Sequence, residues 1–236
     1  MTAEARSRLR HAAVLVVTYA IWLASFEAVG RYASTLPTRD LTSAWDRAVP
    51  LVPAFVWPYE ICYGLPFLAL LVIRDFSRFR AAILAIVIAN VTAFAVYLLV
   101  PVAFPRPPLG ASLSERILAL EYAADFSPGA NKLPSMHVAL SWIMGCAMYR
   151  QRGRAVDLLT FAFIFLVTAS TVLVKQHLLL DAAAGMAWGS RTRSAHLVMG
   201  RTTSSWSWMS WSRPRSLPMP CRLTWPAKRS TGEEQA

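Results

Sequence analysis

Cysteine is scarce in this sequence, and its placement excludes the common uses of the residue. Cys62 and Cys146 fall inside apolar runs, and Cys221 lies in a polar tail. No pair has the spacing of a metal-binding or redox motif, so we expect no disulfide. With four histidines in all, a zinc site is also poorly supported, although His177 and Asp181 have a spacing that metal ligands on a helix can use. We expect no metal and no other cofactor.

Charged residues are also few, which excludes a soluble domain of this size. They make up 16% of the 236 residues, against 56% hydrophobic residues, a balance typical of membrane proteins. A bilayer core requires about 20 apolar residues per helix. Four runs approach that length, and two are shorter: 12–29, 52–73, 81–104 and 155–174, then 136–148 and 178–188. The sequence predicts an all-α, polytopic membrane bundle of six transmembrane helices, or five if the last is incomplete.

Positive charge orients this predicted bundle. Arginines cluster before the first run, between the second and third, and after the 136–148 run: Arg6, Arg8, Arg10, then Arg74, Arg78, Arg80, then Arg150, Arg152, Arg154. Short cytoplasmic loops concentrate Lys and Arg, so we assign the three clusters to the cytoplasm. His137 and His177 are then expected on the non-cytoplasmic side of the cell membrane. The first run has one alternative interpretation, a secretory signal peptide behind a basic leader.

A histidine and an acidic residue share one predicted helix face. Nothing between residues 155 and 184 is Gly or Pro, so only Lys175-Gln176-His177 indicates a break there. One long tilted helix is the alternative. If 178–184 is helical, His177 and Asp181 stand at i and i+4, and the carboxylate can hold one ring nitrogen while the other acts as a nucleophile. A His-Asp pair that merely closes a helix end is the other interpretation, but an acidic side chain in an apolar membrane segment calls for a partner or a function.

A second histidine follows a predicted anion cradle. Pro134 and Ser135 precede the apolar run 136–148 and predict a helix start, whose free backbone N–H groups and hydroxyl suit phosphate oxygens. His137 then lies in the first turn, from where it can donate a proton to a departing alkoxide. Pro-Ser-x-His is a weak signal by itself. Its force lies in the pairing with His177.

Cations near these segments complete the predicted site. Arg106, in the sequence Pro105-Arg106-Pro107-Pro108, offers a planar guanidinium that suits bidentate phosphate binding. An arginine that snorkels to lipid head groups is the alternative. Lys132 and Lys175 are expected to add charge to the same pocket. Trp45, Trp57 and Tyr59 have the character of an aromatic belt at the membrane surface, and we assign them no chemistry.

These elements resemble the type 2 phosphatidic acid phosphatase superfamily, which includes the vanadium haloperoxidases. That family shows Lys-x6-Arg-Pro, Pro-Ser-Gly-His and Ser-Arg-x5-His-x3-Asp, in this order, at the outer ends of a six-helix bundle. The matching residues here, within about residues 10 to 189, are Arg106 and Pro107, then Pro134, Ser135 and His137, then Ser170, His177 and Asp181. The family's leading lysine falls on Leu99, its glycine on Met136 and its second arginine on Thr171. Such replacements resemble the inositolphosphotransferase branch, which includes fungal inositol phosphorylceramide synthase.

The resemblance implies a lipid phosphatase or phosphotransferase. His177 would attack phosphorus to form a phosphohistidine, Asp181 would orient it, and His137 would protonate the leaving oxygen and then activate the acceptor. The substrate would be a membrane lipid phosphate in the bilayer, and the acceptor water or a sugar or inositol hydroxyl, with no nucleic acid involved. The substrate-binding residues would be Arg106, Ser135, Lys175, Lys132 and Ser170. A catalytically silent membrane protein with a lipid-binding or assembly role is the alternative, and a transporter is a third class.

The sequence pattern changes after residue 189. Residues 1–189 form the predicted membrane-embedded phosphatase-like domain, whereas 190–236 are rich in Ser, Arg, Trp and Pro and show neither helical nor strand periodicity. Three interpretations of this tail compete: a disordered basic segment, an aromatic segment on the membrane surface, or an out-of-frame end. The last is favoured, and it would leave the sixth helix incomplete.

Overall fold

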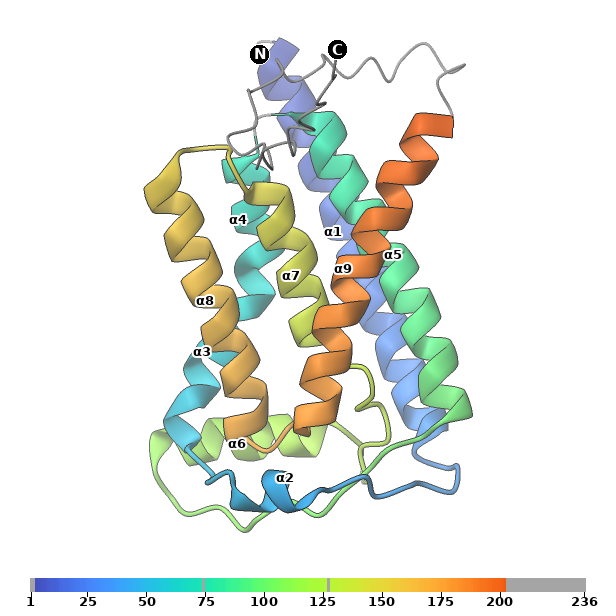
Figure 1. Cartoon of the computed structure of the whole chain (residues 1–236), viewed down its shortest axis with the longest axis vertical. Helices are drawn as coiled ribbons and strands as arrows, with labels where there is room; N and C mark the ends of the chain where they lie inside the picture. Colours follow the sequence, from blue (N-terminus) through green and yellow to red (C-terminus); the bar gives the residue numbers. More distant parts are fainter. Residues whose placement is uncertain (1–2, 74, 127, 203–236) are drawn as a thin grey trace, which may run out of the picture.

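The structure is a computed structural model that describes residues 3–73, 75–126 and 128–202, and these form a bundle of helices (Figure 1). The long rods of the bundle are α1 (Ala3–Ala33), a composite rod, α5 (Phe76–Leu99), α7 (Met136–Met148), α8 (Arg154–Leu173) and α9 (Leu179–Thr202). The composite rod joins η1 (Pro53–Phe55), α3 (Val56–Ile61), η2 (Cys62–Gly64) and α4 (Leu65–Val72). At one end lie the short α2 (Ala44–Ala48) and α6 (Leu113–Ala124). The predicted all-α class is confirmed for the described residues.

Four segments of the described chain are long and apolar enough to cross a membrane. They are Arg8–Ala33, Pro53–Val72, Ser77–Leu99 and Arg154–Leu173, and they correspond to the four long apolar runs of the sequence. Helix α7 is apolar but has only 13 residues, fewer than the roughly 20 that a bilayer core requires. The composition is therefore that of an integral membrane protein, while the predicted number of six spans depends on α7 and α9.

Proline decides where two rods begin or end. Helix α5 ends at Leu99 although the apolar run continues to residue 104, because Pro101 disfavours the helical conformation of the residue before it. In the composite rod, Pro53 and Pro66 lie in the first turns of η1 and α4, where a missing backbone N–H has no cost. This rod is therefore a chain of short helical segments instead of one continuous helix.

The predicted break between the last two rods is confirmed. Helix α8 ends at Leu173 and α9 begins at Leu179, and Lys175 between them has a φ of 55°, which no α-helix accommodates. The backbone N–H groups of Gln176 and His177 both donate to the Thr171 carbonyl. The alternative of one long tilted helix is excluded.

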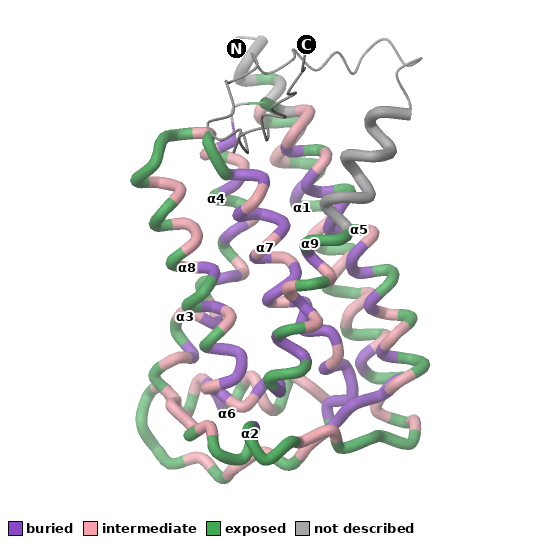
Figure 2. The backbone as a smooth tube through the Cα atoms, viewed as in Figure 1, coloured by how far each residue is buried: buried purple, intermediate pink, exposed green. Residues whose placement is uncertain are grey.

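Helix α7 forms the centre of the bundle. It contacts α4, α5, α8 and α9, and most of its tube is buried in Figure 2. Gly185 allows α9 to approach it closely, because an added Cβ there would lie 2.4 Å from the Ser135 carbonyl oxygen. The outer faces expose large apolar side chains such as Leu71, Leu158 and Leu159, which suits contact with lipid tails.

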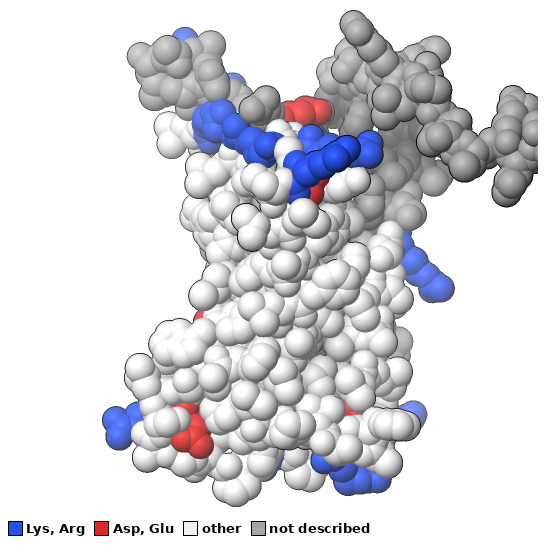
Figure 3. Space-filling view, turned by 60° about the vertical axis from the view of Figure 1, so that its left-hand side comes forward, with Lys and Arg blue, Asp and Glu red and all other residues white. Residues whose placement is uncertain are grey.

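The two ends of the bundle differ in chemistry. The arginines of the α4–α5 and α7–α8 turns meet at one end: Arg152 donates to the carbonyls of Leu71 and Val72, and Arg78 to those of Cys146 and Tyr149. The start of α1 lies at the same end (Figure 1), and Figure 3 shows a largely uncharged belt between the two charged ends. The segments that carry His137 and His177 lie at the opposite end, as the loop pattern predicts; Arg74 lies outside the described residues.

Helix α9 is longer than the sequence pattern predicts. The pattern indicates no helix from Ser190 onward, yet α9 continues to Thr202. The first proline after its start is Pro214, so no proline interrupts the helix in this stretch. The remainder of the predicted tail, 203–236, lies outside the described residues.

Candidate active site

Two imidazole rings from distant parts of the chain lie together at the end of the bundle that carries α2 and α6. His137 is in the first turn of α7, and His177 precedes α9. Their ring centroids are 5.8 Å apart, and the ring planes are inclined by 61°. The backbone N–H of Ser135, the N-cap residue of α7, donates to the Asp181 carbonyl at 3.0 Å. This bond and the contact at Gly185 fix the starts of α7 and α9 side by side, and with them the two rings.

The His177 ring is held by a backbone carbonyl. Its Nδ1 atom lies 3.0 Å from the Lys132 carbonyl oxygen, and since a carbonyl only accepts, Nδ1 carries a proton, which leaves Nε2 as the nitrogen with the lone pair in the neutral tautomer. The Asp181 Oδ2 atom is 3.6 Å from Nδ1, beyond hydrogen-bonding distance, and accepts the Leu178 N–H at 2.9 Å. Asp181 is fully buried. Its carboxyl group therefore fixes the turn that carries the ring and makes no hydrogen bond to the ring itself.

His137 is enclosed by two tyrosines from the composite rod. Tyr63 places its hydroxyl 2.7 Å from His137 Nε2. The Tyr59 ring lies against the imidazole at a centroid distance of 4.3 Å, with its hydroxyl 3.4 Å from Nδ1. Tyr59 is 3% exposed, so its assignment to a membrane-surface belt is wrong. The two tyrosines are four residues apart and share a helix face, a spacing that could have identified them together.

A charge cluster lies directly beside the histidines. The Arg106 guanidinium and the Lys132 ammonium both donate to Asp125 Oδ2, the lysine at 2.6 Å. Both also donate to Gln176 Oε1, at 2.8 and 3.0 Å. The guanidinium stacks over the Tyr122 ring at 4.4 Å. Because Lys132 supplies both an ammonium to this cluster and a carbonyl to His177, the cations adjoin the predicted nucleophile.

The charge state of the cluster follows from burial and pairing. Burial raises the pKa of Asp125, but the Lys132 ammonium and the Arg106 guanidinium outweigh it and lower the pKa to about 2. Burial lowers the pKa of Lys132, and the attraction of Asp125 opposes this only in part. Asp125 is thus ionised at neutral pH. Sequence reasoning brought Arg106 and Lys132 to the pocket but missed Asp125, because loop acids carry no local pattern that marks them.

The remaining predicted residues have different surroundings. Ser135 is fully buried, and its hydroxyl has no hydrogen-bond partner within the described part of the chain. Ser170 is also buried, and its hydroxyl donates to the Val167 carbonyl within α8. The Lys175 ammonium donates to backbone carbonyls of the α2 segment, including that of Asp46 at 2.8 Å. The structure therefore does not bring Lys175 to the Arg106–Lys132 cluster.

Asp46 is a structural residue that sequence reasoning missed. Its Oδ1 atom accepts the Leu179 N–H at 2.7 Å, and so satisfies a free donor at the start of α9. Lys175 bonds to the backbone of the same residue. The two contacts attach the α2 segment to Lys175 before His177 and to Leu179 after it.

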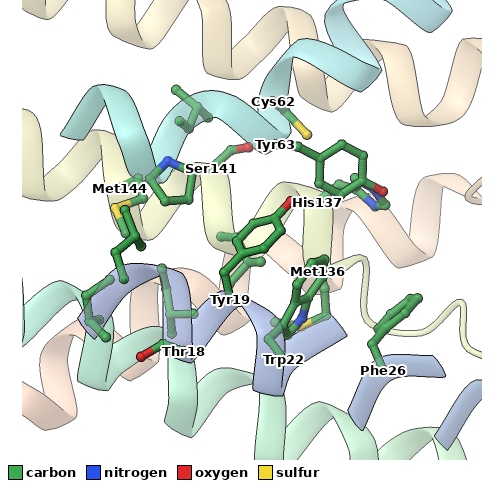
Figure 4. A pocket seen from close by; sticks show the side chains of 16 residues that line it. Thr18, Tyr19, Trp22, Phe26, Cys62, Tyr63, Met136, His137, Ser141 and Met144 are labelled. Atoms are coloured by element: carbon green, nitrogen blue, oxygen red, sulfur yellow. The ribbon is translucent and has the colours of Figure 1, made fainter. Parts of the chain in front are cut away.

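Two cavities adjoin the tyrosine side of His137. An apolar pocket of about 60 Å³ lies between α1, the composite rod, α5 and α7, with His137, Tyr63 and Trp22 among its lining residues (Figure 4). A larger cavity of about 670 Å³ is lined by Glu60, Glu121 and also by Tyr63 and Trp22. The aromatic side chains thus separate an apolar space from an acidic one.

Two carboxyl groups share the acidic cavity. Glu121 on α6 and Glu60 on α3 both line it. Burial and the neighbouring Glu60 raise the pKa of Glu121 to about 8, so the pair holds a proton at neutral pH. Across the described ranges of the chain, no three His, Cys, Asp or Glu side chains converge as a metal site would require.

The fold and the site together give an α-helical bundle with membrane-spanning composition and a histidine pair beside two cations. Residues 41–190 match the model of the PAP2 superfamily, and since this is more than half of the chain, the protein belongs to that superfamily. Membership suggests a phosphatase-type enzyme. A search of curated proteins gives no match.

Proposed function

We propose that this protein is an integral membrane phosphatase or phosphotransferase that acts on a lipid phosphate through a phosphohistidine intermediate. The observation that carries the proposal is the pair of imidazoles 5.8 Å apart beside the Arg106–Lys132 cluster. A nucleophile and an acid must both reach one phosphorus atom, and cations must offset the charge on its oxygens. The acceptor is water or an alcohol such as inositol.

The first step forms the covalent intermediate. The lone pair of His177 Nε2 attacks phosphorus, the N–P bond forms, and the P–O bond to the leaving group breaks. His137 donates a proton to the leaving oxygen. The phosphorylated imidazole is positively charged, and the carbonyl of Lys132 and the buried carboxylate of Asp181 stabilise that charge.

The second step returns the enzyme to its starting state. The acceptor O–H gives its proton to His137 as its oxygen attacks phosphorus, and the N–P bond breaks. Arg106 and Lys132 bind the phosphoryl oxygens throughout. The unpartnered hydroxyl of Ser135 is a further donor to them, whereas Ser170 and Lys175 are positioning residues because their polar atoms are bonded to backbone carbonyls.

The surroundings of His137 support an amphiphilic substrate. The apolar pocket of Figure 4 is lined by His137 and by apolar side chains of helices with membrane-spanning composition, which suits the hydrocarbon part of a lipid. The acidic cavity on the other side of Tyr63 offers a route for water or an alcohol. The arginine-rich end is cytoplasmic by the positive-inside rule, which assigns the site to the non-cytoplasmic face of a bundle in which α7 and α9 complete six spans.

A trapping experiment tests this proposal. The purified protein, in detergent, is incubated with radiolabelled phosphatidic acid, an isoprenyl phosphate and phosphatidylinositol, with and without inositol. We expect labelled product from one class of lipid and an acid-labile, base-stable phosphoprotein. The label should disappear in His177→Ala and remain in the control variant His11→Ala. His11 lies in the N-terminal part of α1, toward the end of the bundle that is opposite the two site histidines.

Two results would contradict the proposal. A phosphoprotein that persists in His177→Ala removes the nucleophile assignment. A folded protein that shows neither turnover nor label supports the alternative, a catalytically silent membrane protein in which Leu99 and Thr171 replace two cations of the family pattern.

A further inference from the structure

One carboxylate cancels half of the positive charge in the candidate phosphate site. Arg106 and Lys132 carry two formal positive charges, and both bond to the same oxygen of Asp125. Lys175 bonds elsewhere, and positions 99 and 171 hold an uncharged Leu and Thr. The local net charge of the cluster is therefore +1.

The backbone holds Asp125 in place against the cations. Asp125 is the C-cap residue of α6, and the chain then turns through Phe126 and Gly129, whose φ angles are 32° and 72°. At Gly129 an added Cβ would lie 3.0 Å from the Asp125 carbonyl oxygen and 3.3 Å from Arg106 Nη2. This loop wraps the cluster closely, and the Asp125 side chain is only 18% exposed. The fold therefore fixes the Asp125 carboxylate against the two cations.

We propose that Asp125 is a specificity-determining residue that makes the site prefer a phosphate group with one negative charge, as in a phosphodiester, over a doubly charged phosphomonoester. This inference rests on the proposed function, because it takes the Arg106–Lys132 pair as the phosphate site. A singly charged phosphate neutralises the +1 cluster. A second negative charge would find both Arg106 and Lys132 already paired with Asp125 and would be repelled by the Asp125 carboxylate at close range.

Binding of two small anions measures this preference without any turnover. Methyl phosphate is doubly charged at pH 8, since its second pKa is about 6, whereas dimethyl phosphate is singly charged. Their affinities for the purified full-length protein are measured by isothermal titration calorimetry. We expect the wild-type protein to bind dimethyl phosphate at least as tightly as methyl phosphate. In Asp125→Asn, the affinity for methyl phosphate should rise about tenfold or more relative to that for dimethyl phosphate.

A control variant that removes a different negative charge tests whether the effect is specific to the position of Asp125. Glu27 lines the rim of the acidic cavity that also contains Asp125, but it is ion-paired with Arg31. We expect Glu27→Gln to leave the ratio of the two affinities unchanged. An equal shift in both variants, an unchanged ratio in Asp125→Asn, or a wild-type protein that binds methyl phosphate more than about tenfold tighter overturns the proposal.

Poor folding of Asp125→Asn must be distinguished from a change in its anion binding. Asp125→Asn leaves two buried cations without their counter-ion, which destabilises a protein, so each variant is checked by thermal unfolding. The paired variant Asp125→Asn with Lys132→Met restores a net charge of +1, and its ratio should return to the wild-type value. If the protein turns over lipid but prefers methyl phosphate, or binds neither anion, the proposed role of Asp125 is refuted and the proposed function is not. The expected preference without any turnover refutes the proposed function alone.

Discussion

The Nδ1 atom of His177 lies 3.0 Å from the backbone carbonyl oxygen of Lys132. If a side-chain carboxylate accepted this hydrogen bond, the orientation of the His177 ring would depend on the conformation of that side chain. A carbonyl is fixed by the backbone, and here the same residue extends its ammonium into the cation cluster. The orientation of the nucleophile and the position of the phosphate-binding charge are therefore set by one residue.

The first prediction concerns Asp181. Because Asp181 Oδ2 is 3.6 Å from His177 Nδ1 and does not hold the ring by a hydrogen bond, Asp181→Asn should lower kcat by only about tenfold to 100-fold, the range for residues that act through another. The asparagine oxygen can still accept the Leu178 N–H. His177→Ala should abolish turnover. Steady-state kinetics of the two variants checks this, and a loss in Asp181→Asn as complete as that in His177→Ala contradicts it.

The second prediction distinguishes the two tyrosines around His137. Removing the hydroxyl in Tyr63→Phe deletes a hydrogen bond of 2.7 Å, and since one such bond contributes about 0.5 to 1.5 kcal/mol, kcat should fall about two- to tenfold. Tyr59→Phe removes a hydroxyl at 3.4 Å and keeps the ring contact, so its kcat should change less. The comparison of kcat for both variants is the measurement. The reverse order would show that ring position depends on Tyr59.

The third prediction concerns the contact between α7 and α9. In Gly185→Ala the new Cβ would lie 2.4 Å from the Ser135 carbonyl oxygen, a backbone atom that cannot move alone. The helices must separate, which should cost about 1 to 3 kcal/mol of unfolding free energy and lower activity, because the two imidazoles are carried by these helix starts. Thermal unfolding and turnover are measured on the same sample.

Gly64→Ala is the matched control for that variant. Nothing lies within 4 Å of a Cβ at Gly64, and its φ of −78° is open to alanine. This change should be neutral or stabilise the protein by up to about 1 kcal/mol. Equal destabilisation by both substitutions would mean that close helix approach at residue 185 is not the cause.

The fourth prediction is a pH dependence of stability that Glu121 controls. Its pKa is raised from 4.5 to about 8 by burial and by Glu60, so the folded state binds the proton more tightly than the unfolded state. This contribution to stability is complete below pH 4.5 and is lost as the pH rises to about 8. Glu121→Gln should therefore be more stable than the wild-type protein at pH 9 and similar to it at pH 4. Thermal unfolding of both proteins at pH 4 and pH 9 is the measurement. A stability difference that appears only at pH 4 would contradict the prediction.

The elements that local sequence patterns predicted well are those with local physical causes. The apolar run 136–148 became α7 with the same bounds, with Ser135 as its N-cap. Lys175-Gln176-His177 marked a true break, although no Gly or Pro is present. In both cases the relevant interactions lie within a few residues of each other, so neighbouring residues carry the information. Helix α9 beyond residue 189 was missed because its composition is polar, and a polar composition without proline does not by itself end a helix.

Contacts between distant segments were beyond such patterns. Asp125, Gln176 and Tyr63 were not assigned to the site, and Tyr59 was assigned to the membrane surface. Gln176, Tyr59 and Tyr63 each meet a partner that is 70 or more residues away, and Asp125 meets Arg106 and Lys132 at separations of 19 and 7 residues. No periodicity links these positions. Lys175 shows the same limit in the other direction. Its charge is adjacent to His177 in sequence, but the left-handed turn at residue 175 places its ammonium at the α2 segment.

The sequence by itself determined that this chain is an apolar α-helical bundle and that His137 and His177 stand at the same end of it, because hydrophobic runs and the charges between them fix which ends of the helices coincide. The tertiary structure alone decided what holds each ring and what balances each charge. Those choices depend on which side chains and carbonyls meet when α7, α9 and the loop 125–135 pack together, and packing distances of a few ångströms are not encoded in the spacing of residues along a chain.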